Sequence, residues 1–163
     1  DWSSDVCSSD LERWCVNRFE SAPPPESQLV RAVALNDADI SLLDRARSMI
    51  AMRQRQDWHH IGCAMRTRSG AVFAAVHLEA HVGRVAVCAE AIAVGMGAAA
   101  GDTDISVIVA VNRAGEIVAP CGICRELISD YAPEAEVIVP GAEGPERVSI
   151  RTLLPNKYTR AQH

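Results

Sequence analysis

The sequence predicts a three-layer α/β domain with a mixed sheet. Helical and strand-like segments follow one another in the order α-β-β-α-β-α-β. Two segments, ISVIVAV (105–111) and AEVIVP (135–140), are rich in β-branched apolar residues, which is typical of strands buried on both faces. A chain of 163 residues with 48% hydrophobic residues is long enough for one compact domain with its own core.

The first half of the domain is expected to hold one helix and a hairpin. The helix begins near Asp37, in DADISLLDRARSMIAMRQRQ (37–56), where an aspartate can cap a helix and apolar residues recur at helical spacing. The hairpin follows because IGCAMRT (61–67) and AVFAAVHL (71–78) flank the turn signal Arg-Ser-Gly.

The remaining helices carry recognisable stop signals. CAEAIAVGMGAAAG (88–101) is predicted as a helix of small residues that ends at Gly101. CGICRELISDYA (121–132) is predicted as a helix stopped by Pro133. SIRTLLP (149–155) is the last predicted helical turn.

The segment before the helix is expected to lie outside the domain, which spans 37–163. Residues 1–11, DWSSDVCSSDL, look like translated sequencing-adapter DNA. The alternative is a native disordered tail, and in either case these residues are not expected to belong to the fold. Residues 12–36 contain three consecutive prolines and predict a flexible segment.

Charge and hydropathy argue against two classes of partner. The 21 acidic and 16 basic residues give a net charge of −5 without a basic cluster, so no nucleic-acid partner is expected. No apolar run reaches the roughly 20 residues of a membrane span and no secretory signal is evident, so we expect no membrane association and a cytoplasmic location. Six cysteines in a reducing compartment favour metal ligation or catalysis over disulfides.

Two short motifs carry the candidate chemistry. VCAEA places Glu90 two residues after Cys88, and APCGICRE contains Cys121 and Cys124. One helix and one strand separate the motifs, so both can begin at the same end of neighbouring parallel strands, each opening a helix. Helix N-termini favour thiolates over thiols. The spacing therefore predicts a site with three sulfur ligands from two rigid elements.

Three protein ligands leave one position of a tetrahedral zinc ion to water, as in catalytic sites. Zinc lowers the pKa of that water to roughly 7 and so generates hydroxide. Glu90, on the same first helical turn as Cys88, can take the proton and hand it to a leaving group. Two other interpretations stay open: a redox pair of Cys121 and Cys124, and a structural zinc with a fourth protein ligand. Candidates for that fourth ligand are Cys63, His59, His60, His77 and His81.

The pair of motifs CAE and PCGIC is similar to the signature of the cytidine deaminase superfamily. The resemblance extends from about Trp58 to Tyr158, over most of the predicted domain. It implies the three-layer α/β/α cytidine deaminase-like fold with a mixed five-stranded sheet. It also implies a hydrolase that acts on cyclic amidines. Cysteine in first place, at Cys88, resembles the free-nucleoside cytidine deaminases and the blasticidin-S deaminases.

The resemblance assigns roles to the motif residues. It implies one Zn²⁺ per subunit, with Cys88, Cys121 and Cys124 as ligands. Glu90 would shuttle protons while the zinc-bound hydroxide attacks C4 of cytosine and ammonia leaves. The remaining implied contacts are with the base: the Ala119 carbonyl with the amino group, and the Ala89 amide with the base oxygen.

The resemblance also implies contacts with the rest of the substrate. Glu79, in VHLEA, matches the ribose-binding Asn-x-Glu motif, with His77 in place of asparagine. Trp58 or His59 would stack on the base, and Tyr158 is a further expected contact.

One departure concerns the charge of the metal site. Cytidine deaminases place an arginine directly after CAE, where this chain has Ala91, and Arg125 can offset part of the thiolate charge instead. The missing arginine, together with Tyr158, favours the blasticidin-S type.

The sequence thus predicts a zinc-dependent hydrolytic deaminase that converts cytidine, deoxycytidine or a related N4-substituted aminopyrimidine nucleoside to the uridine product, in pyrimidine salvage. By resemblance we expect a homotetramer. A blasticidin-S-type deaminase is the alternative enzyme, and a catalytically silent, zinc-stabilised binding module is the alternative from another class. Hydrolysis needs the carboxylate of Glu90, whereas a structural site would be indifferent to it.

Overall fold

A computed structural model describes residues 33–159 of the chain. The predicted adapter-derived segment (1–11) and most of the predicted flexible segment (12–36) lie outside the described residues. Within the latter segment, Val33 and Ala34 form a short strand that pairs with another strand of the sheet. The predicted domain boundary at residue 37 stays a prediction.

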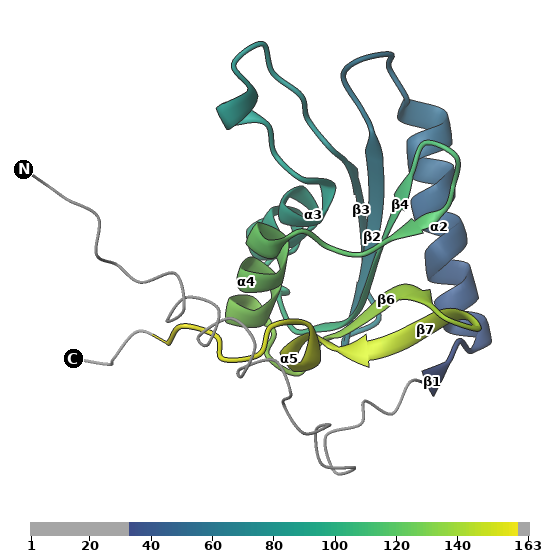
Figure 1. Cartoon of the computed structure of the whole chain (residues 1–163), viewed down its shortest axis with the longest axis vertical. Coiled ribbons are helices and arrows are strands. Elements are labelled where there is room, and N and C mark those ends of the chain that lie inside the picture. Colours follow the sequence, from purple (N-terminus) through teal and green to yellow (C-terminus); the bar gives the residue numbers. More distant parts are fainter. Residues whose placement is uncertain (1–32, 160–163) are drawn as a thin grey trace, which may run out of the picture. The chain divides into compact units, whose positions relative to one another are not determined.

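The described residues form one mixed sheet with helices on both faces (Figure 1). The strands are β1 (Val33–Ala34), β2 (Ile61–Thr67), β3 (Val72–Val76), β4 (Ile105–Asn112), β5 (Ile117–Val118), β6 (Glu136–Gly141) and β7 (Gly144–Ser149). Their order is β1-β7-β6-β4-β2-β3, with β5 paired to β4. The β4–β6 pair is parallel and the other described pairs are antiparallel.

The helices are α2 (Asp37–Arg53), the short 3₁₀ helix η2 (Gly83–Val85), α3 (Ala89–Ala99), α4 (Gly122–Tyr131) and α5 (Ile150–Leu153). Gly101, with φ +74°, follows the end of α3 and confirms the predicted stop, because a left-handed residue there suits glycine. None of the helices in the described range is long and apolar enough to cross a bilayer.

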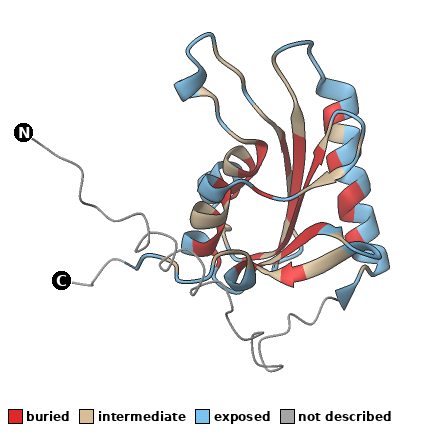
Figure 2. Ribbon diagram, viewed as in Figure 1, coloured by how far each residue is buried: buried red, intermediate tan, exposed pale blue. Residues whose placement is uncertain are grey.

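Successive residues of the central strands point into two separate cores. Ala64 of β2 and Val109 of β4 pack with α2, whereas Met65 and Ile108 pack in the core that includes α3 and α4. Buried residues therefore lie on the sheet and on the helix sides that face it (Figure 2). This alternation confirms the predicted three-layer α/β/α arrangement.

The sheet has more strands than the five expected. Two of its seven strands, β1 and β5, are only two residues long. The sequence GPERVS of β7 shows no apolar alternation, and Val148 alone among its residues is buried. Its pairing with β6 and β1, not its own pattern, makes this segment a strand.

One buried carboxylate fastens α2 to the sheet. Asn36, not the predicted Asp37, caps the helix: its Oδ1 accepts from the Asp39 N–H at 3.0 Å. The Asp39 side chain is fully buried and accepts hydrogen bonds from Arg66 of β2 and Arg147 of β7, each at 3.0 Å. One residue thus joins the start of a helix to two separate strands.

We expect Asp39→Ala to lower the free energy of unfolding by about 3 kcal/mol, because it removes the fully buried carboxylate of an ionic network and leaves Arg66 without its carboxylate partner, while Arg147 keeps Glu136 at 2.8 Å. Asp44→Ala, which breaks an exposed pair with Arg47 on the same helix, is the matched control and should cost under about 0.5 kcal/mol. Urea unfolding measures both, and equal losses would contradict the anchoring role of Asp39.

Candidate active site

Two helix N-termini meet at one end of the sheet. Cys88 is the N-cap residue of α3 and Cys121 is the N-cap residue of α4, and their Sγ atoms lie 3.7 Å apart. Cys124, on the first turn of α4, completes a group in which all three Sγ atoms lie within 4.8 Å of one another. The structure thus brings together the three cysteines that the sequence predicted as ligands.

The strands that lead to these helices are not neighbours, and this part of the prediction was wrong. β3 and β4 are both antiparallel to β2, so they run in the same direction with β2 between them. The short strand β5 also intervenes between β4 and α4. Both helices still begin at the same end of the sheet, because β3 and β4 both end there.

A backbone bridge places the predicted substrate contacts beside the metal-binding motif. Leu78 and Val87 exchange two backbone hydrogen bonds, each of 2.9 Å. His77 and Glu79 flank Leu78, and Cys88 directly follows Val87. The bridge therefore fixes the segment that carries His77 and Glu79 against the start of α3.

The three cysteines fit a zinc ion. With Zn–S bonds of about 2.3 Å, two sulfur ligands of a tetrahedral ion lie about 3.8 Å apart, and the Sγ atoms of Cys88 and Cys121 are separated by 3.7 Å. Over residues 33–159, no fourth His, Cys, Asp or Glu side chain joins this group. Cys63, a candidate fourth ligand, is buried in the core on β2. The arrangement favours an open three-ligand site over a closed structural one.

Glu90 lies on the first turn of α3 and is only 6% exposed. Ile108, Pro120 and Ile128 line the same small pocket as its side chain. Burial raises the pKa of the Glu90 carboxyl above its usual range, although hydrogen bonds from its own N–H and from the Cys124 thiol act in the opposite direction. A raised pKa makes such a carboxyl a better proton acceptor than an exposed glutamate.

The three thiols differ in how readily they ionise without a metal. Burial raises the pKa of Cys88 and of Cys124, and the nearby Glu90 carboxylate adds to both effects. Burial also opposes ionisation of Cys121, but hydrogen bonds from the Cys124 N–H, from the two neighbouring thiols and from the Ile123 N–H lower its pKa overall. Binding a cation here therefore releases protons from Cys88 and Cys124.

The structure gathers most of the predicted sugar and base contacts. The Glu79 N–H donates to the Trp58 carbonyl at 3.1 Å, and His59 Nδ1 lies 2.7 Å from the His77 carbonyl. The Trp58 ring packs edge-on against His81, with ring centroids 5.3 Å apart. The roles of these residues toward a substrate stay predictions.

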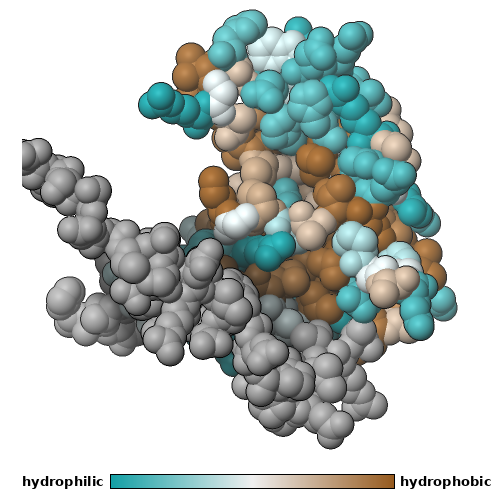
Figure 3. Space-filling model, in the orientation of Figure 1, coloured by the Kyte–Doolittle hydropathy of each residue, from teal (hydrophilic) through white to brown (hydrophobic). Residues whose placement is uncertain are grey.

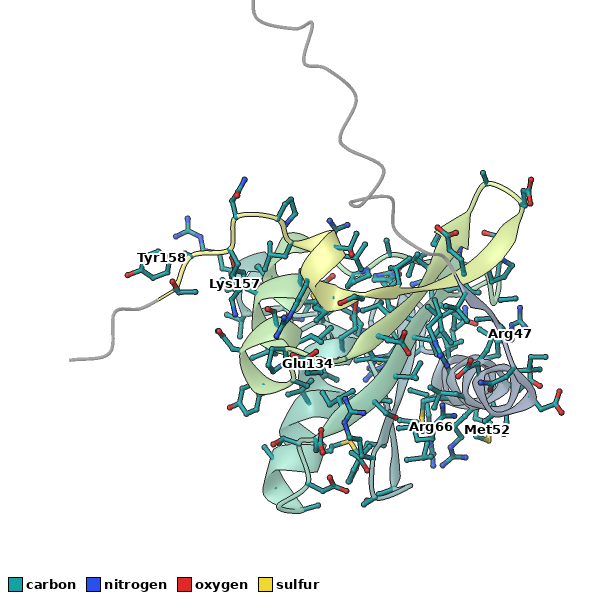
Figure 4. The ribbon with its side chains drawn as sticks, turned by 90° about the horizontal axis from the view of Figure 1, so that it is seen from below. Arg47, Met52, Arg66, Glu134, Lys157 and Tyr158 are labelled. Atoms are coloured by element: carbon teal, nitrogen blue, oxygen red, sulfur yellow. The ribbon has the colours of Figure 1, made fainter. Side chains whose placement is uncertain are left out.

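Two predicted contacts flank the cysteines. Ala89 is buried at the start of α3, where a backbone N–H has no partner within the helix. Ala119 is exposed and immediately precedes the buried Pro120. Tyr158, in contrast, is 78% exposed and points away from the folded elements (Figure 4).

Arg125 makes backbone contacts. Its Nε donates to the Pro120 carbonyl at 2.8 Å, and its Nη1 donates to the Leu153 carbonyl at 3.0 Å. The guanidinium thus ties the loop before Cys121 to α5. Its predicted role in offsetting thiolate charge stays a prediction.

Sequence reasoning gave His60 no role beyond a possible fourth ligand of a structural zinc. The structure instead groups it with His77 and Glu79, which form a set of potential ligands distinct from the three cysteines. The pairing of His77 N–H with the Ile61 carbonyl brings the start of β2 beside the end of β3 and so makes this grouping possible. The adjacent histidines in WHHIG could have indicated a shared site. No local pattern, however, predicts which residues at the start of β2 lie beside the end of β3.

The connection from β3 to α3 carries exposed apolar side chains. Leu78, Val82, Val85 and Val87 are all exposed, and Figure 3 shows apolar atoms among polar ones on this part of the surface. Ile123, on the first turn of α4, is also exposed. These side chains are available for contacts with another chain, and the predicted homotetramer stays a prediction.

Comparison with known proteins finds similar curated sequences and similar folds. The blasticidin-S deaminase of Bacillus cereus is 42% identical over 134 residues, which cover 77% of this chain and 96% of that protein. No family model matches the chain.

Solved cytidine deaminases share the fold. The enzyme from Mycobacterium leprae has a TM-score of 0.65 and 23% identity, and the match covers 75% of this chain and 100% of that one. The enzyme from Burkholderia pseudomallei has a TM-score of 0.63 and 24% identity, with 76% and 100% covered. At these identities the likeness extends to the fold alone.

We expect Cys121→Ser to weaken the binding of Co²⁺ to metal-free protein by at least about tenfold. Mutation of residues that only hydrogen-bond to metal ligands already lowers metal affinity by about 10–100-fold, and Cys121 is a proposed ligand itself. Thiolate-to-cobalt charge-transfer absorption in the near ultraviolet reports the binding. Cys63→Ala, which changes a buried cysteine outside the group, is the control and should retain the absorption. Loss of the band in both variants would contradict the assignment.

The buried Glu90 should also make stability depend on pH. Because its pKa is raised in the folded state, the stability that the protonated carboxyl contributes is lost as pH rises above the usual glutamate pKa of about 4.3. In metal-free protein we therefore expect Glu90→Gln to increase the free energy of unfolding at about pH 7.5, with the gain shrinking toward about pH 4.

Urea unfolding at several pH values measures this effect. Glu143→Gln, on the exposed β6–β7 turn, is the control and should stay within about 0.5 kcal/mol of the wild type. A gain from Glu90→Gln that is the same at every pH would contradict the expectation.

Proposed function

The chain belongs to the cytidine deaminase superfamily and is a hydrolytic deaminase, and from this premise we propose that it removes the amino group from the cytosine ring of blasticidin S in preference to cytidine or deoxycytidine. The observation that carries the preference is the 42% identity to a blasticidin-S deaminase over 96% of its length. Ala91, where cytidine deaminases place arginine, supports the same choice.

Three cysteines from two helix starts support one zinc ion per chain. A zinc ion bound there supplies Lewis acidity, which lowers the pKa of a coordinated water to about 7. Cys88, Cys121 and Cys124 hold the ion and leave one position open.

Glu90 moves the protons in the proposed reaction. Its carboxylate accepts a proton from the attacking water and delivers it to the exocyclic nitrogen of the base. The C4–O bond forms, the C4–N bond breaks, and water is exchanged for ammonia. The nearly complete burial of Glu90 supports this role, because a raised pKa brings a carboxyl closer to the working pH.

Backbone groups orient the ring. The Ala89 N–H is one of the first donors of α3, which lack intrahelical acceptors, so it is free to hold the base oxygen. The Ala119 carbonyl accepts from the amino group that leaves. Arg125 supports this position indirectly, because its hydrogen bond to the Pro120 carbonyl fixes the peptide between Pro120 and Cys121, one residue beyond Ala119.

Cytidine is the second candidate substrate, and Glu79 is the observation that favours it. Glu79 matches the ribose-binding motif, and the bridge between Leu78 and Val87 fixes it beside the cysteine motif.

The His77 imidazole is bulkier than the asparagine amide expected there and offers different donors. It therefore favours a substrate whose sugar differs from plain ribose. Pyrimidine salvage would follow from cytidine turnover, and antibiotic resistance from blasticidin S turnover.

We expect zinc-loaded protein to consume blasticidin S with a higher kcat/KM than cytidine or deoxycytidine, measured by the ultraviolet change of the ring. Glu90→Gln should lower kcat by about 10²–10⁴-fold, the range for loss of a positioned acid or base, while zinc stays bound. Glu143→Gln, an exposed glutamate, is the control. Turnover of cytidine alone would move the assignment to the second candidate, and turnover of none of the three would contradict the proposal.

A further inference from the structure

A second group of potential metal ligands lies outside the three cysteines. His60, His77 and Glu79 each offer a ligand atom, and these atoms lie within 4.8 Å of one another. The Glu79 Oε2 atom faces both rings, at 3.8 Å from His77 Nε2 and 4.0 Å from His60 Nε2. The two rings are tilted by 40°, with centroids 5.3 Å apart.

The His77 ring is the buried and poorly partnered member of this group. The His77 side chain is only 13% exposed, yet its Nδ1 has no hydrogen-bond partner among the described residues. Its Nε2 is too far from Glu79 for a charge-assisted hydrogen bond, which is normally about 2.7–2.9 Å long. The Nε2 atom, which faces Glu79, is therefore available to a ligand.

The backbone holds the group in place. The His77 N–H donates to the Ile61 carbonyl at 2.9 Å, and the Glu79 N–H donates to the Trp58 carbonyl at 3.1 Å. The Glu79 Oε1 atom accepts from the Ala80 N–H at 3.0 Å, which leaves Oε2 directed at the histidines. His77 and Glu79 are therefore positioned by contacts that do not depend on a ligand.

We infer that His60, His77 and Glu79 form a second cation site, which binds a divalent transition-metal ion such as Zn²⁺ or Co²⁺. Two imidazoles and one carboxylate are suitable ligands for these ions. Ligand atoms around a tetrahedral ion of this kind lie about 3.3 Å apart, so the two separations from Glu79 Oε2, 3.8 and 4.0 Å, have to close by about 0.5 and 0.7 Å. Exposures of 40% for His60 and 33% for Glu79 leave the site open to an ion and its remaining waters.

The ionisation of His77 is compatible with this role. Burial lowers its pKa, and the neighbouring His60 and His59 act in the same direction, while Glu79 opposes them. The ring is therefore neutral near pH 7, and a neutral imidazole is the form that binds a metal.

The two sites should differ in the metals they prefer. The three-cysteine site offers soft thiolates, which favour Zn²⁺, whereas the second site offers nitrogen and oxygen. One equivalent of zinc therefore fills the cysteines first. The second ion would occupy the place that the proposed function gives to the sugar-like part of the substrate, so it should compete with substrate; this consequence rests on the proposed function.

The test is a titration of the full chain with Co²⁺ after one equivalent of zinc has been added. We expect cobalt d–d absorption in the visible region without thiolate charge transfer in the near ultraviolet, because no sulfur belongs to the second group. His60→Ala and Glu79→Gln should each weaken this binding by at least about tenfold. His81→Ala, an exposed histidine beside Trp58 and outside the group, is the matched control and should bind as the wild type does.

Thermal unfolding of each variant verifies that it folds, and Glu79→Gln preserves the size of the side chain. Absence of the visible band in wild-type protein would overturn the inference, as would equal affinity in wild type, His60→Ala and Glu79→Gln. The titration needs no turnover, so its failure is distinct from failure of the deaminase assay. In that assay, a second equivalent of zinc should raise KM with kcat unchanged, and less so in His60→Ala.

Discussion

The close approach of two helix N-termini is the constraint on which the site depends. The thiols of Cys88 and Cys121 meet at 3.7 Å, with Cys124 and the buried Glu90 beside them. Four groups that can carry negative charge thus share a small, partly buried volume, and burial opposes ionisation of each of them. Only a cation makes this arrangement favourable in its ionised form. Folding brings the ligands together, and the metal compensates the charge that folding concentrates.

Backbone hydrogen bonds outside the helices connect the parts of the site. The Leu78–Val87 bridge attaches the segment of Glu79 to the start of α3, and the hydrogen bond from His77 to Ile61 attaches the same segment to β2. On the other side, Arg125 joins the loop before Cys121 to α5 through two carbonyls. One network of backbone contacts therefore links the segment of His77 and Glu79 with α3, and the loop before Cys121 with α5, although these segments lie far apart in the sequence.

The sequence was informative wherever a pattern is local. Periodicity and stop signals predicted α3, α4 and the buried strands, and the spacing of Cys88, Glu90, Cys121 and Cys124 predicted the site. It was uninformative where structure arises from pairing alone: β7 is polar and becomes a strand only against β6. The placement of β2 between β3 and β4 and the grouping of His60 with Glu79 depend on register in the same way. No residue pattern within a single segment encodes such a contact.

The charge of the three-cysteine site affects how much of the proposed catalysis would come from the metal ion and how much from Glu90. Three thiolates around one divalent ion leave a net negative charge, and Ala91 offers none of the compensation that an arginine would give. Arg125 is engaged with the carbonyls of Pro120 and Leu153. What compensation the described residues supply comes from dipoles, such as the Cys124 and Ile123 N–H groups that donate to Cys121. A divalent ion held there would be a weaker Lewis acid, so the proposed reaction would depend more on Glu90, whose pKa burial raises.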